Sequence, residues 1–456
     1  MYFKVSLMKE NRSWVKGVIT LLLPALSALA HAQAPDTGKL NRFFDRLAEN
    51  NKAMGSLVIA RGGKAIYARA FGYSEIGDRV KTPLTAASRF RIGSITKMFT
   101  AVMILQLAEE GRLHLDDKLD RFFPQIPDAG RITIAQILMH RSGIHDAVLD
   151  KNLRGTPKTA PLTREELLGL IAKGVPDFAP GARHQYSNSG YIVLGFVIEK
   201  LTGQSYSDNL RERITSKLGL ADTYMATGPI NTARQEALTY RNIGGEWKQD
   251  AETHPSLLFS AGAIVSTPPD LARFIGALFD GKLISGDHLA AMKTMQDGDG
   301  WGMEPFSFAG KTFYGHTGGA DNYGAWVAYL PEEKLAVAYT TNAKMYPVGD
   351  IMNGIVDMYY NKPFALPVFE TIIVSTDILD KYTGVYSTAA MPVKFTISRN
   401  GAKLYIQPNA ESPAPLEATA QNKFTITAGV TVEFDTEKKQ MILTRGGRAT
   451  VFTREH

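Results

Sequence analysis

The chain has 456 residues, 44% of them hydrophobic and 21% charged, and this length suits one catalytic-sized domain with a small second one. The net charge of +6 is weak and no basic stripe interleaved with aromatic residues occurs, so nucleic acid is not an expected partner. The absence of cysteine excludes disulfides, a thiol nucleophile and cysteine-bound zinc.

Residues 1–34 have the pattern of a secretory signal peptide. A basic start precedes an apolar stretch from about Gly17 to Leu29, and small-x-small sites end at Ala32 and Ala34. The apolar stretch is shorter than the roughly 20 residues that a membrane-spanning helix needs. We therefore expect cleavage and export to the periplasm or the medium, with no integral membrane span in the mature chain.

The mature chain is predicted to begin with a helix and a hairpin. Apolar residues recur with the spacing of one helix face at Leu40, Phe43, Phe44 and Leu47. Residues 56–73 then read as two strands joined at a Gly62-Gly63 turn.

The middle of the chain is predicted to be mainly helical. One helix opens at Gly93-Ser94, and residues 112–260 contain further helices. Helix ends are marked by capping residues at Thr163 with Glu166, Ser189, Gly203, and Thr267 with Pro268.

Strands return at 311–319, 323–330 and 334–342, followed by a helix near 347–360. Because strands from both ends enclose a helical middle, the pattern favours one mixed sheet with helices on its faces, within a domain spanning 35–362. Prolines mark a linker over 363–378. Residues 379–456 alternate apolar and polar, which predicts a small antiparallel barrel or sandwich.

Ser94 and Lys97 form an S-x-x-K motif at the start of the apolar run. Residues three apart share a helix face, with Cβ atoms about 5–6 Å apart, so the amine can reach the hydroxyl. Burial lowers the pKa of such a lysine and allows it to act as a base. The alternative is an N-cap serine beside a surface lysine, and the motif also occurs within residues 6–16 of the leader.

Two further motifs lie far from this serine in the sequence. Tyr186 and Asn188 directly precede a predicted helix, from which position they can project into a cleft. His316-Thr317-Gly318-Gly319 lies on a predicted strand, whose glycines would let a substrate backbone approach. A metal or cofactor is not expected, because the close histidines 140 and 145 do not share a helix face and no nucleotide-binding motif occurs.

The order and spacing of these motifs resemble the penicillin-recognising serine hydrolases, in particular the branch of class C β-lactamases, DD-peptidases and class VIII-type esterases. The resemblance extends over the blocks 90–117, 137–144, 186–203, 260–274 and 314–331. It implies an α+β, β-lactamase/transpeptidase-like fold: an antiparallel sheet flanked by helices, with an all-helical subdomain. The C-terminal region corresponds to a small antiparallel β-barrel-like domain carried by peptidase-like members.

The resemblance also implies roles for the motif residues. Ser94 matches the acylated nucleophile, Lys97 the lysine bonded to it, and Tyr186 a proton shuttle, with either Lys97 or Tyr186 as the base. Asn188 matches the amide that contacts a substrate carbonyl and holds the lysine. The backbone N–H groups of Ser94 and Gly319 match the oxyanion hole.

The expected function is an exported serine hydrolase that forms a Ser94 acyl-enzyme with D-amino-acid peptides, such as peptidoglycan stem peptides, or with small esters. His316, Thr317 and Gly318 would bind substrate. Class C β-lactamases carry lysine in place of His316, and a histidine is only partly charged at neutral pH. A β-lactamase is therefore the first alternative, and a penicillin-binding sensor without turnover is the second.

Overall fold

The computed structural model describes residues 35–148, 159–243, 245–367, 369, 371–389, 391–409, 413–426, 430–445 and 448–455. The predicted signal peptide, residues 1–34, lies outside these ranges. Among the described residues, no helix is both long enough and apolar enough to cross a bilayer.

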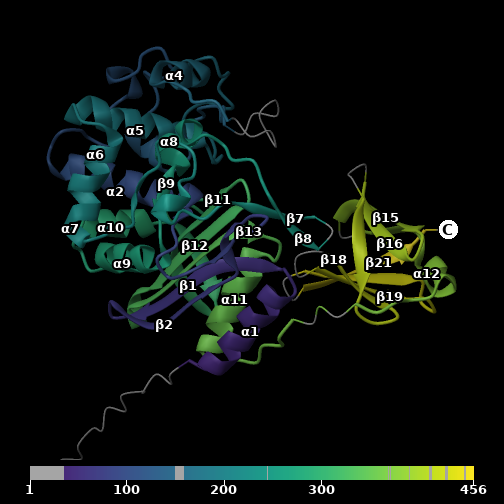
Figure 1. Ribbon diagram of the computed structural model, residues 1–456. Helices are drawn as coiled ribbons and strands as arrows, with labels where there is room; N and C mark the ends of the chain where they lie inside the picture. The colour runs from purple at the N-terminus through teal and green to yellow at the C-terminus, as the bar shows by residue number, and fades with distance from the viewer. Residues whose placement is uncertain are drawn as a thin grey trace, which may run out of the picture. The chain divides into compact units, whose positions relative to one another are not determined.

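A six-stranded sheet with the order β10-β11-β12-β13-β1-β2 forms the centre of the first domain (Figure 1). Its strands are β1 (Ala53–Arg61), β2 (Lys64–Phe71), β10 (Glu304–Phe308), β11 (Lys311–Ala320), β12 (Tyr323–Leu330) and β13 (Leu335–Lys344). Each neighbouring pair is antiparallel, so the expectation of a mixed sheet is wrong. Short hairpins join four of the five pairs, and hairpins produce antiparallel neighbours.

Helices cover both faces of this sheet. Helices α1 (Thr37–Glu49) and α11 (Val348–Tyr359) share an apolar core with Leu57 and Ile59 of β1. The alternate residues Val58 and Ala60 belong to a second core, which includes α9 (Pro268–Phe279). Burial on both faces explains why β1 reads as a nearly continuous apolar run.

A helical region adjoins the sheet, and its centre is α2 (Thr96–Glu109) (Figure 1). Residues 96–107 of α2 are all buried, with α5 (Asn188–Thr202) and α8 (Pro255–Gly262) among the packed helices. The remaining helices are α3 (Ile134–Leu138), α4 (Arg164–Ala172), α6 (Tyr206–Leu210), a π-helical turn (Arg211–Thr215), α7 (Ser216–Leu218) and α10 (Gly286–Lys293).

The predicted helix ends are largely confirmed. Thr163 and Glu166 form a capping box, Gly203 ends α5 in the left-handed conformation, and the Thr267 side chain caps α9. Two starts differ from the prediction. Ser187, rather than Ser189, caps α5, and a 3₁₀ turn, η1 (Gly93–Ile95), precedes α2, so Ser94 is not its N-cap.

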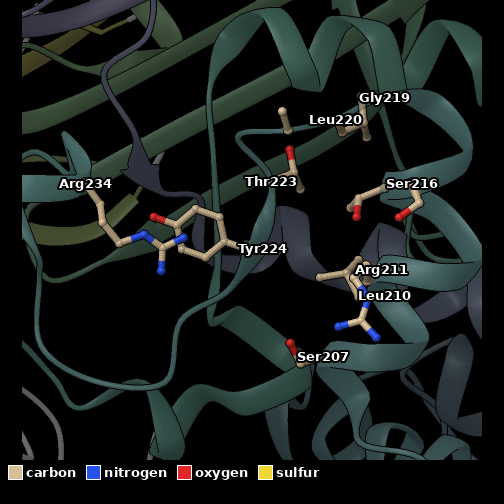
Figure 2. A pocket seen from close by; sticks show the side chains of 11 residues that line it. Ser207, Leu210, Arg211, Ser216, Gly219, Leu220, Thr223, Tyr224 and Arg234 are labelled. Atoms are coloured by element: carbon tan, nitrogen blue, oxygen red, sulfur yellow. The ribbon is translucent and has the colours of Figure 1, made fainter.

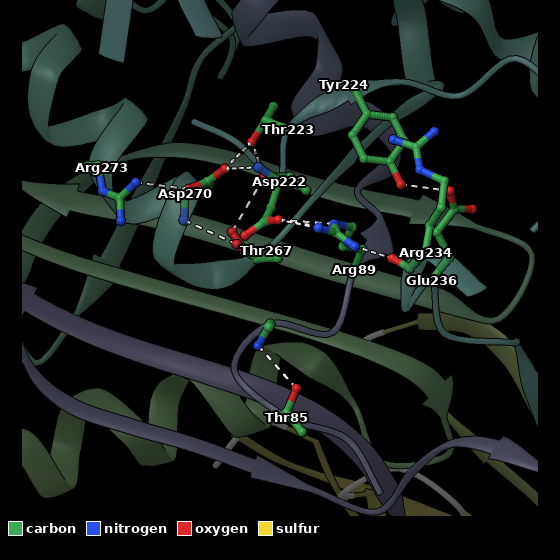
Figure 3. A network of polar contacts seen from close by, with 12 residues as sticks. Thr85, Arg89, Asp222, Thr223, Tyr224, Arg234, Glu236, Thr267, Asp270 and Arg273 are labelled. Carbon is green, nitrogen blue, oxygen red and sulfur yellow. Dashed lines mark hydrogen bonds and ion pairs between the residues drawn. The ribbon is translucent and has the colours of Figure 1, made fainter. Parts of the chain in front are cut away.

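A small sheet holds the segment that leads to Ser94. It has the order β5 (Phe90–Arg91), β9 (Ile264–Ser266), β6 (Tyr224–Met225). A polar network supports its ends: Arg89 pairs with Asp222, and Thr223 donates to Asp270 over 3.0 Å (Figure 3). These contacts fix β5 against α9 just before the turn that carries Ser94. Two further hairpins pair β3 (Tyr73–Ile76) with β4 (Lys81–Pro83) and β7 (Tyr240–Ile243) with β8 (Glu246–Gln249).

The C-terminal domain is a closed antiparallel barrel in its described residues, preceded by α12 (Thr376–Tyr382). Its strands are β14 (Gly384–Thr388), β15 (Met391–Asn400), β16 (Lys403–Pro408), β17 (Ala414–Ala418), β18 (Lys423–Ile426), β19 (Val430–Asp435), β20 (Gln440–Arg445) and β21 (Arg448–Arg454). β14 pairs with both β15 and β21, which closes the ring. The predicted alternation therefore produces a barrel with its own apolar core rather than an open sandwich.

Candidate active site

The Nζ atom of Lys97 lies 3.1 Å from the Oγ atom of Ser94. Ser94 is in the 3₁₀ turn η1 and Lys97 is in the first turn of α2, so the three-residue spacing brings both side chains to one face. The apolar remainder of α2 anchors this pair in the domain core. The S-x-x-K pair is therefore in contact, as its spacing predicts.

Lys97 is fully buried, with 0% of its surface exposed. Burial lowers the pKa of its ammonium to about 7, although the negative charges of Asp146, Glu304 and Asp299 act in the opposite direction. A substantial fraction of this lysine is consequently a neutral amine near neutral pH. The alternative of a surface lysine beside a capping serine is excluded by this burial.

Two oxygen acceptors take hydrogen bonds from Lys97. Its Nζ lies 2.8 Å from Oδ1 of Asn188 and 2.9 Å from the carbonyl oxygen of Ala261. A neutral amine has two N–H bonds and one lone pair, and neither acceptor can donate a proton. With both N–H bonds directed at these oxygens, the lone pair faces the Ser94 hydroxyl.

Asp146 fixes the orientation of the Asn188 amide. Its Oδ2 atom accepts hydrogen bonds from both the Nδ2 and the backbone N–H of Asn188, each over 2.9 Å. Because a carboxylate only accepts, the NH₂ group of Asn188 must face Asp146 and its carbonyl oxygen must face Lys97. A chain of contacts therefore runs from Asp146 through Asn188 and Lys97 to Ser94.

Tyr186 lies on the other side of the same serine. Its phenol lies near enough to Ser94 for that side chain to lower the phenol's pKa against the larger effect of burial, and the Nζ of Lys97 lies 4.8 Å from the centre of the Tyr186 ring. Burial raises the pKa of Tyr186, so the phenol keeps its proton at neutral pH. This arrangement gives Ser94 one partner able to accept a proton and one able to donate.

The ring of His140 packs against the ring of Tyr186. The two rings stack with centroids 4.2 Å apart, and the His140 Nδ1 atom accepts from the backbone N–H of Ser187 over 3.0 Å. Burial lowers the pKa of His140 well below its usual value, which keeps the ring neutral and leaves Nδ1 free to accept. His140 thus holds the segment that carries Tyr186 and Asn188.

The edge of β11 approaches Ser94 along two glycines. A Cβ atom on Gly318 would lie 1.9 Å from the carbonyl oxygen of Ile92, and one on Gly93 would lie 2.5 Å from the backbone N of Gly319. Gly93 also has a φ of +52°, which L side chains rarely adopt. Glycine at these positions is needed for the Ser94 turn and the strand to come this close.

The N–H of Gly319 points to the open edge of β11. β10 pairs with residues 311–315 only, and the N–H of Thr317 donates across that edge to Oε2 of Glu304 over 3.2 Å. Since N–H groups alternate along a strand, Gly319 presents its N–H on the same edge. The N–H groups of Gly319 and Ser94 can therefore stabilise an oxyanion together.

His316 is 2% exposed and lies beside Glu304, with 3.9 Å between Nδ1 and Oε1. Its Nδ1 donates to the carbonyl oxygen of Thr317 over 2.5 Å. Burial lowers the pKa of His316, while Glu304 opposes the shift. A neutral ring with its proton on Nδ1 leaves Nε2 as a hydrogen-bond acceptor, so the charge available at this position is small.

The structure brings the sequence-predicted residues to one place: Ser94, Lys97, Tyr186, Asn188, His316, Thr317, Gly318 and Gly319. Sequence reasoning missed Asp146 and Glu304, which follow no motif. The close histidines do not form a pair, because His140 stacks on Tyr186 and His145 contacts Asp177. In the described part of the chain, no cluster of three potential metal ligands occurs.

A hollow of about 450 Å³ lies elsewhere, between α6, the π-helical turn, α7 and β6 (Figure 2). Arg211 and Arg234 stand at its sides, and Thr223 and Tyr224 of the network in Figure 3 form one wall. None of the sequence-predicted site residues lines this hollow. The candidate active site is therefore the β11 edge at Ser94.

A serine hydroxyl and a buried amine, set between a helical region and the glycine-bearing edge of an antiparallel sheet, define the class of serine hydrolases with a β-lactamase-like fold. Residues 40–356 match the Beta-lactamase family, and the chain belongs to it. The chain is a serine hydrolase related to penicillin-binding proteins.

Curated relatives support this assignment. Penicillin-binding protein 4* of Bacillus subtilis (strain 168) is 26% identical over 430 residues, which cover 87% of this chain and 93% of the relative. Teichoic acid D-alanine hydrolase of Staphylococcus aureus is 25% identical over 246 residues, covering 53% of this chain and 58% of the relative.

Solved structures that resemble this chain also support the assignment to this family. The octameric penicillin-binding protein homologue from Pyrococcus abyssi has a TM-score of 0.66 at 26% identity, covering 92% of this chain and 100% of that chain. D-amino acid amidase from Ochrobactrum anthropi SV3, complexed with L-phenylalanine amide, has a TM-score of 0.63 at 26% identity, covering 71% of this chain and 99% of that chain.

Proposed function

We propose that this serine hydrolase works through an acyl-enzyme on Ser94, with D-amino-acid peptides or small esters as acyl donors. The observation that carries the proposal is the contact chain from Asp146 through Asn188 and Lys97 to Ser94. It supplies a neutral amine with its lone pair directed at the hydroxyl, so activation of Ser94 does not require a histidine base.

In the acylation step, Lys97 accepts the Ser94 proton while Oγ forms a bond to the substrate carbonyl carbon. The carbonyl oxygen becomes an oxyanion between the N–H groups of Ser94 and Gly319. The C–N or C–O bond then breaks, and the leaving atom takes a proton from the Tyr186 phenol. The proton held by Lys97 returns to Tyr186, so the acyl-enzyme forms with no net change in protonation.

Deacylation runs the same transfers with water in place of the leaving group. Water loses a proton to the Tyr186 and Lys97 pair as its oxygen bonds to the acyl carbon, and Ser94 regains a proton when the ester bond breaks. Lys97 is the base in this proposal because burial brings its pKa to about 7, whereas burial raises the pKa of Tyr186. Tyr186 remains the proton donor.

The proposed acyl donors follow the relatives. The names D-amino acid amidase and teichoic acid D-alanine hydrolase indicate that related chains act on D-amino acyl groups. A D-alanyl-D-alanine peptide is therefore the first peptide substrate to examine, with small esters beside it. The shielded, weakly charged His316 favours these over a class C-like β-lactamase.

The test compares wild type and Ser94→Ala with a p-nitrophenyl ester, a D-alanyl-D-alanine peptide and a β-lactam, following turnover and intact mass. We expect turnover of the ester or peptide by wild type, and a loss of at least about 1,000-fold in Ser94→Ala. Covalent acylation that persists in Ser94→Ala would overturn the mechanism. A stable β-lactam adduct without turnover of any compound would support a sensor instead.

We also propose export to the periplasm or the medium, based on the basic and apolar pattern of residues 1–34. N-terminal sequencing of the protein recovered outside the cytoplasm should start after Ala32 or Ala34. Recovery of the full chain in the cytoplasm alone would contradict export.

A further inference from the structure

The side chain of Glu304, at the start of β10, reaches past the end of its own strand along the edge of β11. The backbone of Glu304 pairs with Gly315, whereas its carboxylate contacts Thr317, two residues further along. Its Oε2 atom accepts from both the backbone N–H and the hydroxyl of Thr317, each over 3.2 Å. A carboxylate therefore occupies the place at this edge that a backbone carbonyl of a longer β10 would take.

The carboxylate of Glu304 is next to the proposed oxyanion site along the same edge. N–H groups that face one edge of a strand recur every second residue, so the N–H of Gly319 follows that of Thr317 after about 7 Å. The substrate carbonyl is proposed to bind at Gly319. A substrate that extends along the edge toward Thr317 consequently meets the carboxylate of Glu304.

The direction from Ser94 toward Glu304 is that of the leaving group. Gly318 faces the Ser94 turn, because a Cβ atom on this glycine would lie 3.3 Å from the Ser94 backbone N. After burial, which has the largest effect on each group, the negative charge of Glu304 raises the pKa of both Lys97 and Tyr186. These two residues handle the proton of the leaving group in the proposed mechanism. The leaving group therefore lies on the side of Glu304, and the acyl group extends away from it.

The negative charge of Glu304 has no strong counter-charge. Across the residues that the structure describes, no lysine or arginine forms an ion pair with it, and His316 lies 3.9 Å away between Nδ1 and Oε1. Burial lowers the pKa of His316, and its Nδ1 proton is directed at the carbonyl oxygen of Thr317. A second carboxylate, Asp299, is close enough that the charge of Glu304 adds to the effect of burial in raising its pKa. The leaving-group side of the site is therefore negative.

The hydroxyl of Thr317 adds to this preference. Because it donates its proton to Glu304, its oxygen offers only lone pairs to a ligand. It can accept a hydrogen bond from an amide or an ammonium group, but it cannot donate one to a carboxylate. A carboxylate on the leaving group would thus meet a like charge and no donor at this position, and like charges brought together on binding exclude a ligand.

We propose that Glu304 determines the charge of the leaving group, accepting neutral and cationic leaving groups and rejecting those that carry a carboxylate. This inference rests on the proposed function, because it places the acyl carbon at Ser94. Within that function it favours amides, esters and peptides with a blocked C-terminus over peptides from which an amino acid with a free carboxylate would be released.

The experiment compares N-acetyl-D-alanyl-D-alaninamide with N-acetyl-D-alanyl-D-alanine, which share the acyl group and differ in the charge of the leaving group. In wild type we expect the ratio of kcat/KM values to favour the amide at least about tenfold. Glu304→Gln keeps an oxygen that can accept from the Thr317 N–H and removes the charge. It should reduce the ratio at least about tenfold, chiefly through faster turnover of the free acid, whereas Glu304→Asp should keep the preference for the amide.

Three aryl esters test the same point with better leaving groups: 3-carboxyphenyl, 3-carbamoylphenyl and 3-(trimethylammonio)phenyl butyrate. Relative to the neutral carbamoyl ester, Glu304→Gln should raise kcat/KM for the anionic ester and lower it for the cationic one. Each ester is compared between proteins, so its intrinsic reactivity cancels. The matched control is Glu333→Gln, whose side chain is 20% exposed like that of Glu304 and bonds to Tyr360 over 3.0 Å and Lys311 over 3.1 Å. It should leave all ratios unchanged.

An equal change for every substrate in Glu304→Gln, with unchanged ratios, would show that Glu304 only supports Thr317 and would overturn the inference. The proposed function would remain intact, since wild type still turns over the substrates. The side of the site is tested with p-nitrophenyl hydrogen succinate and p-nitrophenyl butyrate, which differ in the charge of the acyl group. If Glu304→Gln changes that ratio instead, the carboxylate faces the acyl group and the assignment is wrong.

Binding to the Ser94→Ala protein supplies a readout that needs no catalysis. In NMR titrations, N-acetyl-D-alanyl-D-alanine should bind at least about tenfold more weakly than its amide, and adding Glu304→Gln should remove most of this difference. Equal affinity of the two compounds for Ser94→Ala would overturn the inference. Failure of wild type to turn over any of the compounds would separately contradict the proposed function.

Discussion

The Nζ of Lys97 lies 2.8 Å from Oδ1 of Asn188, and this contact orients the base of the site. Asp146 holds the NH₂ end of the same amide, so only its carbonyl oxygen can face the lysine. The Ala261 carbonyl takes the second N–H of a neutral amine. The geometry therefore directs the remaining lone pair at Ser94 without any histidine in the relay.

The activity of the wild-type protein should rise with pH. Lys97 must be neutral to accept the Ser94 proton, and burial brings its pKa to about 7, so kcat/KM for a neutral ester should increase through a midpoint near pH 7. The buried histidines 140 and 316 have lowered pKa values and should titrate below this limb. A pH-stat assay from pH 5 to 9 provides the measurement, and a decline in kcat/KM between pH 6 and 8 would contradict Lys97 as the base.

Replacing Asp146 with asparagine should affect both rate and pH profile. Asn188 loses a carboxylate that accepts one hydrogen bond from its side-chain amide and one from its backbone N–H, so we expect kcat to fall about tenfold to 100-fold, with less effect on KM. Asp146 also raises the pKa of Lys97, so its removal should shift the acidic limb to lower pH. The shift distinguishes this role from simple misfolding, which would reduce activity equally at every pH.

Gly93→Ala should damage the oxyanion site. The new Cβ would lie 2.5 Å from the Gly319 backbone N, at a φ of +52°, and loss of one oxyanion donor reduces kcat by about 10²–10³-fold. The matched control is Gly62→Ala, which has a φ of +55° but no atom within 4 Å of the new Cβ. Both variants should lose about 1–2 kcal/mol of unfolding free energy from backbone strain. Only Gly93→Ala should lose activity, and an equal loss in Gly62→Ala would assign the effect to strain.

His140→Asn should separate two roles of this residue. Asparagine tolerates the φ of +54° at this position and can supply an acceptor for the Ser187 N–H, but it removes the ring that stacks on Tyr186. We expect a thermal midpoint close to wild type and a kcat reduced by about tenfold, since aromatic pairs contribute about 0.5–1.5 kcal/mol beyond burial. His140→Ala, which loses both contacts, should be less stable. Full activity in His140→Asn would show that the stacking does not position Tyr186.

Much of the fold follows from short-range patterns. The helix face of α1, the β1–β2 hairpin, the Thr163 capping box and the alternation of the barrel strands each depend on residues close in sequence, and each is found in the structure. The prediction of a mixed sheet is wrong, because the relative direction of two paired strands depends on which strands, distant in sequence, become neighbours. The pairing of β1 with β13, nearly 300 residues apart, is not encoded by any local period.

The residues of the candidate site also fall into two groups, those that short motifs predict and those that no motif predicts. S-x-x-K, Y-x-N and H-T-G are local motifs, and their joint order along the chain predicts the residues of the candidate site. Asp146 and Glu304 belong to no motif, and each acts through a hydrogen bond from another element: Asp146 accepts from Asn188 at the start of α5, and Glu304 accepts from Thr317 of β11.

The sequence by itself predicted Ser94 and Lys97 as a reactive pair and indicated the family, because residue type and spacing along one helix decide which groups can react. The tertiary structure alone decided how these groups are tuned. Full burial of Lys97 lowers its pKa, and Asp146 sets the direction of the Asn188 amide. Desolvation and orientation depend on what surrounds a side chain in three dimensions, and that environment comes from segments far apart in the chain.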